Sequence, residues 1–138
     1  MSAFIVGAAC INSIVAYLGG HADRFCWLNR DLGYDVSQPK DLHRLAGALH
    51  ALNCEAVDQR YGRGTAAGDT ASAPPFEYRP VIRDGVGVYK AILCLLYQCS
   101  EGDVPETPLY KALENMGNVI ADDVVSGLPA FETASWGD

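Results

Sequence analysis

The sequence is poor in basic residues and lacks a long apolar run. Ten lysine and arginine residues stand against 17 aspartate and glutamate residues, for a net charge of −7 at pH 7. A nucleic-acid-binding surface needs clustered cations that release counterions from phosphates, so direct DNA or RNA binding is disfavoured. No run of 18 apolar residues could span a membrane, and residues 1–20 lack the lysine or arginine of a secretory signal. We therefore expect a cytoplasmic protein whose folded domain starts at Met1.

Motifs of the common catalytic and metal sites are missing as well. The sequence has no GxxxxGK, no GxGxxG after a strand and no HExxH. It has no CxxC pair either, and its odd set of five cysteines fits reduced thiols that pack as small apolar side chains. The sequence thus gives no sign of an enzyme, a cofactor or a bound metal.

What is present is the composition of an ordinary globular domain, with 49% hydrophobic and 20% charged residues in 138. Apolar residues spaced three or four apart predict about four helices, and β-favouring residues predict a few short strands. We therefore expect a single domain over 1–138, α+β and mainly helical. The expected helices lie around 11–18, from Pro39 toward Tyr61, from Val86 to Ser100 and from Thr107–Pro108 to Gly127, and the expected strands at 1–6, 25–28 and 76–79.

Two segments carry further expectations. Residues 62–75 (GRGTAAGDTASAPP) contain no large apolar side chain that could offset their ordering entropy, so we expect a flexible loop there. The predicted helix 86–100 is apolar on nearly all sides, which indicates burial all round and places Leu93 and Leu96 in the core. Cys94 and Cys99 would be buried with it, and burial keeps thiols inert.

The charge is distributed unevenly along the chain. Residues 1–83 balance eight acids with eight bases, whereas residues 84–138 carry nine acids against Lys90 and Lys111. The whole net charge therefore belongs to the last 55 residues. Such a surface could attract a basic partner and speed association, or it could simply keep the protein soluble.

Several small groups of residues could carry chemistry or binding. His43, His50 and Cys54 share a helical face, but one helix supplies too few ligands for a metal. A Cys–His nucleophile pair between residues distant in sequence stays open, although no cysteine lies in a recognisable elbow. Asp122 and Asp123 are helix neighbours about 100° apart, so they cannot share a substrate proton. Arg60 and Tyr61 are residue types enriched at binding hot spots, although a plain helix end, with arginine near the last carbonyls, is the favoured explanation.

Several short segments follow one another in a characteristic order along most of the chain. They are Met1–Val6, Ile11–Ala16, Leu49–Cys54, Val57–Gly62, Cys94–Glu101, Glu106–Thr107, Leu128–Pro129 and Ala134–Gly137. In this order they resemble a family of small proteins of bacteriophages and prophages of Gram-negative bacteria. The low-complexity residues 62–75 depart from that pattern, and the family has no catalytic residues to carry over.

The resemblance implies a context rather than a mechanism. Small phage accessory proteins often neutralise a host defence by binding one of its proteins, so we expect a non-enzymatic inhibitor, plausibly an anti-CRISPR protein. The alternative is a protein that sequesters a nucleotide signal through Arg60, Arg63, Arg79 or Arg83. Self-association stays open. The expected partner-binding residues are Glu114, Asp122 and Asp123 in the acidic half, with Arg60 and Tyr61.

Overall fold

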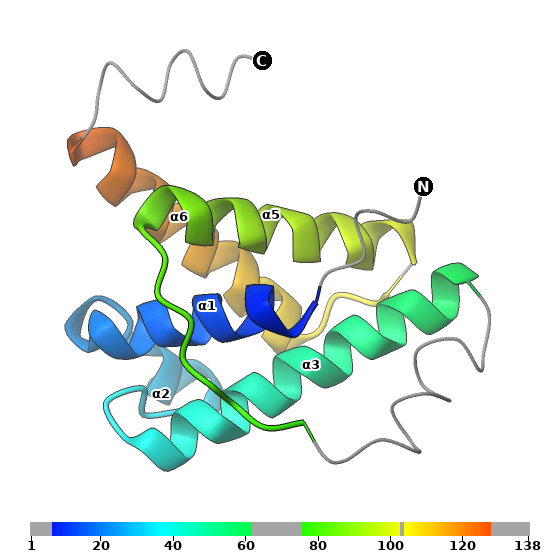
Figure 1. Cartoon of the computed structure of the whole chain (residues 1–138), viewed down its shortest axis with the longest axis horizontal. Coiled ribbons are helices and arrows are strands. Elements are labelled where there is room, and N and C mark those ends of the chain that lie inside the picture. The colour runs from blue at the N-terminus through cyan, green and yellow to red at the C-terminus, as the bar shows by residue number, and fades with distance from the viewer. Residues whose placement is uncertain (1–6, 62–75, 103, 128–138) are drawn as a thin grey trace.

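The chain folds into a bundle of helices in the computed structural model, which describes residues 7–61, 76–102 and 104–127. An extended segment, 76–84, crosses α1 and α3 before α5 begins (Figure 1). The described residues form α1 (Ala8–Gly20), the 3₁₀ helix η2 (Ala22–Arg24), α2 (Trp27–Leu32), α3 (Pro39–Tyr61), α5 (Gly85–Glu101) and α6 (Pro108–Gly127).

The predicted α+β class is wrong, because no strand forms within the described residues. Residues 25–28 turn helically instead: the Leu28 N–H donates to the Phe25 carbonyl, and the Asn29 N–H donates to the Cys26 carbonyl. Residues 76–79 are extended but pair with no described strand, and their aromatic side chains pack on α3. The predicted strand 1–6 and the predicted loop 62–75 lie outside the described residues.

The helix starts predicted from proline are confirmed. α3 begins at Pro39, and α6 begins at Pro108 after Thr107, whose Oγ1 accepts a hydrogen bond from the Tyr110 N–H at 3.2 Å. Proline suits the first turn because its missing N–H has no partner there. α5 has a cap of its own, since Asp84 Oδ1 accepts the Gly87 N–H at 2.8 Å.

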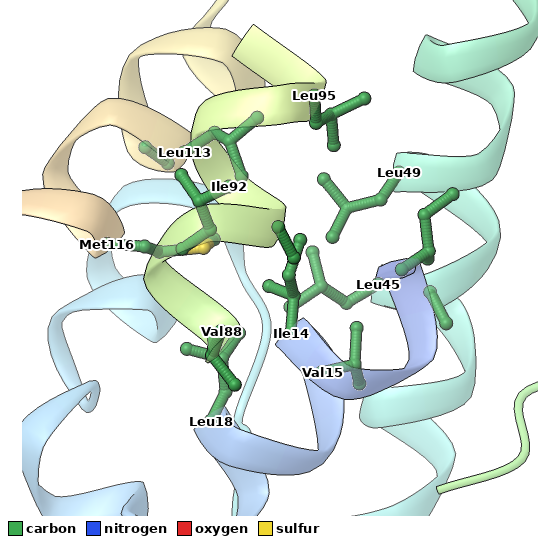
Figure 2. Packing of buried hydrophobic residues seen from close by; sticks show 14 of the residues in the cluster. Ile14, Val15, Leu18, Leu45, Leu49, Val88, Ile92, Leu95, Leu113 and Met116 are labelled. Atoms are coloured by element: carbon green, nitrogen blue, oxygen red, sulfur yellow. The ribbon is translucent and has the colours of Figure 1, made fainter. Parts of the chain in front are cut away.

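The hydrophobic core is centred on α5, which packs against α1, α3 and α6. Figure 2 shows side chains of these four helices meeting, with Ile92 and Met116 on one side of α5 and Leu95 facing Leu49 of α3. α6 also reaches α2, so the short helix closes that end of the core. The largest side chains without any exposed surface are Phe25, Ile11, Ile14, Leu18, Leu28, Leu45, Leu49, Ile92, Leu95, Leu113, Met116 and Ile120.

The expectation that this helix is buried all round is wrong. One side of α5 faces solvent, where 42% of Leu93 and 55% of Tyr97 are exposed, and Cys94 is exposed as well. Three neighbouring helices cover only part of the circumference of α5. Its sequence is apolar on nearly all sides, so some apolar residues lie on the uncovered side and face solvent. Leu96 is half-buried, and Cys99 is buried as expected.

α5 ends where its backbone nearly touches that of α3, which makes Gly102 a sensitive position. A Cβ on Gly102 would lie 2.5 Å from the Ala56 carbonyl oxygen and 3.2 Å from its carbonyl carbon. Backbone atoms cannot rotate away as a side chain can. We expect Gly102→Ala to destabilise the fold at the upper end of the about 1–3 kcal/mol typical of overpacking, or beyond it.

Gly47 offers a matched control for this prediction. It lies inside α3, and a Cβ there would meet nothing within 4 Å. Since alanine is the better helix former, Gly47→Ala should stabilise the protein by about 0.5–1 kcal/mol. Urea unfolding of both variants therefore tests the close approach, and two shifts of the same sign and size would contradict it.

Candidate functional site

A groove between α5 and α6 is the surface that best combines exposed apolar and charged side chains. It has a volume of about 330 Å³ and runs beside Gly117, whose missing side chain leaves it open. A Cβ on Gly117 would lie 3.3 Å from Ile92 Cγ2, so the two helices pack closely at its floor. We call this surface the α5–α6 groove; its lining is Tyr89, Ile92, Leu93 and Leu96 from α5, and Glu114, Asn115, Gly117 and Asn118 from α6.

The two walls of the groove differ in chemistry. Leu93 and Leu96 give the α5 wall apolar surface that is exposed or half-buried. The α6 wall presents Glu114, Asn115 and Asn118, all exposed. The amides can donate and accept hydrogen bonds, whereas the carboxylate only accepts. The groove is therefore suited to an apolar side chain flanked by donors, as in an amphipathic basic segment.

Two of the predicted partner-binding residues lie on this wall or continue it. Glu114 lines the groove, and Asp122 follows Glu114 and Asn118 at four-residue spacing, which keeps all three on one helical stripe. Both acids are exposed, and neither takes part in an ion pair within the part of the chain that the structure describes. Their charge is thus available to a partner.

Asp123 is placed elsewhere. Its two carboxylate oxygens accept hydrogen bonds from Arg24, at 2.6 Å to Nη2 and 3.1 Å to Nε, which ties α6 to η2. Burial raises the pKa of Tyr17 on α1, and the nearby charge of Asp123 adds to that rise. Asp123 therefore has an intramolecular role, and the structure does not bring it to the α5–α6 groove. As expected from helix geometry, it points away from Asp122.

Arg60 and Tyr61 are the last two residues of α3. Their side chains lie outside the described part of the structure, so the hot spot predicted there stays a prediction. Of the residues that line the groove, the sequence predicted only Glu114 as partner-binding, and Leu93, Asn115 and Asn118 are among those it missed. The signal for the two asparagines was their spacing with Glu114 and Asp122, which marks the polar side of α6.

The three residues considered for a metal site are separated by the fold. His43 meets the edge of Tyr78, with ring centroids 5.3 Å apart, whereas Cys54 Sγ lies 3.5 Å from His50 Nε2. Among the described residues, no group of three histidine, cysteine, aspartate or glutamate side chains could hold a metal ion. The contact between His50 and Cys54 follows from their four-residue spacing on α3, and it is not the pair of distant residues that the sequence left open.

Two other hollows are less suited to binding. One, of about 340 Å³, lies between α3 and the start of α6 and is mainly apolar, with Ala48, Leu52, Val104 and Leu109 in its lining and Glu55 at one side. The other, of about 130 Å³, lies between the end of α1 and residues 81–83, and includes Arg83. Neither shows the pairing of a polar wall with an apolar wall.

Comparisons with known proteins give no relative: no family model, curated protein or solved structure matches the chain. The resemblance to phage proteins therefore remains a prediction. Among the described helices, none is long and apolar enough to cross a membrane.

Proposed function

We propose that the chain is a non-enzymatic binding protein whose α5–α6 groove holds a basic, amphipathic segment of a partner protein. The observation that carries this proposal is the exposed Glu114, which lines the groove together with the exposed Leu93 and is continued along the same stripe of α6 by the exposed Asp122. Protein interfaces usually have apolar contacts at the centre and charged residues at the rim.

The resemblance suggests which partner this is. We propose a phage- or prophage-encoded inhibitor that acts in the host cytoplasm on a protein of a defence system, plausibly of the CRISPR machinery. Many proteins of such systems bind nucleic acids and so carry the basic surface that an acidic groove would attract. The order of short segments along the chain supports the phage origin, and the α5–α6 groove supports the mode of binding.

Sequestration of a nucleotide signal is the alternative, and the described residues give it little support. Arg79 forms an ion pair with Glu77 at 3.0 Å, so its charge is already partly balanced. Arg83 lines a hollow of about 130 Å³, whereas pockets for small ligands commonly measure about 300–1,000 Å³. Arg60 and Arg63 lie where no side chain is described.

The test starts from the partner recovered from host lysate on the immobilised protein and identified by mass spectrometry. Its association with the purified chain is then followed by surface plasmon resonance from low to high salt. We expect Glu114→Gln with Asp122→Asn to slow association several-fold at low salt and to flatten the salt dependence, because edge charges act mainly on the on-rate.

Two further variants show whether the groove itself is the binding surface. Asp23→Asn with Glu55→Gln removes the same charge from η2 and α3, so it should leave association close to the wild-type rate. Leu93→Asp should raise the dissociation rate, since an interface loses most when an apolar contact at its centre is replaced. Wild-type kinetics in both groove variants would exclude the groove as the binding surface, and a slow Asp23/Glu55 variant would move the site toward α3.

A further inference from the structure

His50 and Cys54 form a contact on α3 that the proposed binding function does not use. They are one helical turn apart, both half-buried, with Cys54 Sγ 3.5 Å from His50 Nε2. Helix geometry brings residues four apart to the same face, so spacing alone accounts for their proximity. The imidazole ring is held in addition by a residue from outside the helix.

Phe76 fixes the orientation of that ring. Its side chain stacks on the imidazole of His50, with ring centroids 4.3 Å apart and planes 15° apart. Phe76 belongs to the extended segment that crosses α3 and packs against the core. The imidazole is therefore held between its own helix and a residue far along the chain, with Nε2 directed at the thiol.

His50 holds a neutral imidazole in this contact. Burial lowers the pKa of His50, so its imidazole is neutral at pH 7. A neutral imidazole has one nitrogen that donates and one that accepts, and Nε2 accepts from the thiol when Nδ1 carries the hydrogen. Other charged groups close by are Glu55 and Asp58 on α3, and the Glu77–Arg79 pair beside Phe76. His50 is thus a base in direct contact with the Cys54 thiol.

The other described cysteines lack such a base. Cys99 is buried, which raises the pKa of its thiol to about 11, and burial also raises the pKa of Cys94. Cys26 is exposed, and no described side chain forms a hydrogen bond with it. Thiol reactivity follows the ease of losing the proton together with access. Cys26 thus provides an accessible reference thiol without a base.

We propose that Cys54, with His50 as its base, is a site of thiol–disulfide exchange with small-molecule disulfides. The Cys54 proton moves to His50 Nε2, and the sulfur forms a bond to one sulfur of the disulfide while the S–S bond breaks. The departing sulfur takes the proton from Nε2 and leaves as a free thiol. Cys54 is oxidised to a mixed disulfide, and the small disulfide is reduced. The group added to Cys54 lies beside the stacked rings of His50 and Phe76. The redox state of the surroundings therefore acts on residues 76–84, the segment that crosses α3.

The experiment uses the full chain and oxidised glutathione. Mass spectrometry of digested samples follows mixed-disulfide formation at Cys54 and Cys26 in the same molecules at pH 7. We expect Cys54 to react several-fold faster than Cys26 although Cys26 is more exposed. His50→Gln should bring the Cys54 rate down to that of Cys26 or below. A Cys54 rate no faster than that of Cys26, or one unchanged by His50→Gln, would overturn the proposal.

A second measurement does not depend on whether the His50→Gln variant folds. NMR of the ¹⁵N-labelled wild-type protein reports which ring nitrogen of His50 carries the hydrogen. We expect the hydrogen on Nδ1 at pH 7 and a change in the Nε2 signal when Cys54 is replaced by serine. A hydrogen on Nε2 would show that His50 donates toward the sulfur and cannot be its base, which would equally overturn the proposal.

Discussion

Replacing Phe25 with alanine should lower the free energy of unfolding by about 3–5 kcal/mol, the range for a large buried aromatic side chain. Phe25 has no exposed surface, and its ring lies 6.3 Å from the rings of both Tyr17 and Trp27. Alanine would leave a cavity between α1 and α2 that these neighbours cannot fill. Domains of this kind have a total stability of about 5–15 kcal/mol, so the loss takes a large share of it.

Urea unfolding followed by tryptophan fluorescence, to which Trp27 next to the cavity contributes, measures this loss. Phe25→Leu is the matched control, because it keeps most of the apolar volume and should cost clearly less than Phe25→Ala. Equal losses in the two variants would mean that the site does not depend on the ring, and a loss below about 1 kcal/mol would place Phe25 outside the core.

Phe25 also shows why the strand predicted at 25–28 is wrong. Phe25, Cys26, Trp27 and Leu28 favour extended conformations locally, yet in the structure they turn so that Phe25 and Leu28, three residues apart, are both buried. The three-residue spacing of Phe25 and Leu28 favours a helical turn, whereas the β propensity of the four residues favours a strand. Tertiary packing decided between them, and such packing routinely outweighs local preference.

The long helices could be predicted because local signals agreed there. Proline at the start and apolar residues every three or four positions mark α3 and α6 without any reference to the rest of the chain. The α5–α6 groove is different, because it depends on which side of α5 its neighbours leave uncovered. The Arg24–Asp123 pair is another case: its partners are 99 positions apart, so no local pattern indicates that Asp123 is occupied while Asp122 is exposed.

Two leucines of α5 test the difference between local sequence signals and tertiary packing, because the sequence pattern predicts the same burial for both. Leu95 has no exposed surface, whereas 42% of Leu93 is exposed, although both belong to the same apolar run. Leu95→Ala should cost about 2–5 kcal/mol, since it removes apolar contacts and leaves a cavity between α5 and α3. Leu93→Ala should cost less than about 1 kcal/mol, because much of that side chain is already in water.

The two substitutions remove the same atoms from the same helix, so the small gain in helix propensity that alanine brings is shared and cancels in the comparison. Urea unfolding at one temperature gives both free energies, and an unchanged m-value confirms that the same surface is exposed on unfolding. A large loss at both positions would mean that Leu93 is covered in solution, by a second copy or by another part of the chain. If a second copy covers Leu93, the stability of the wild-type protein should also rise with its concentration.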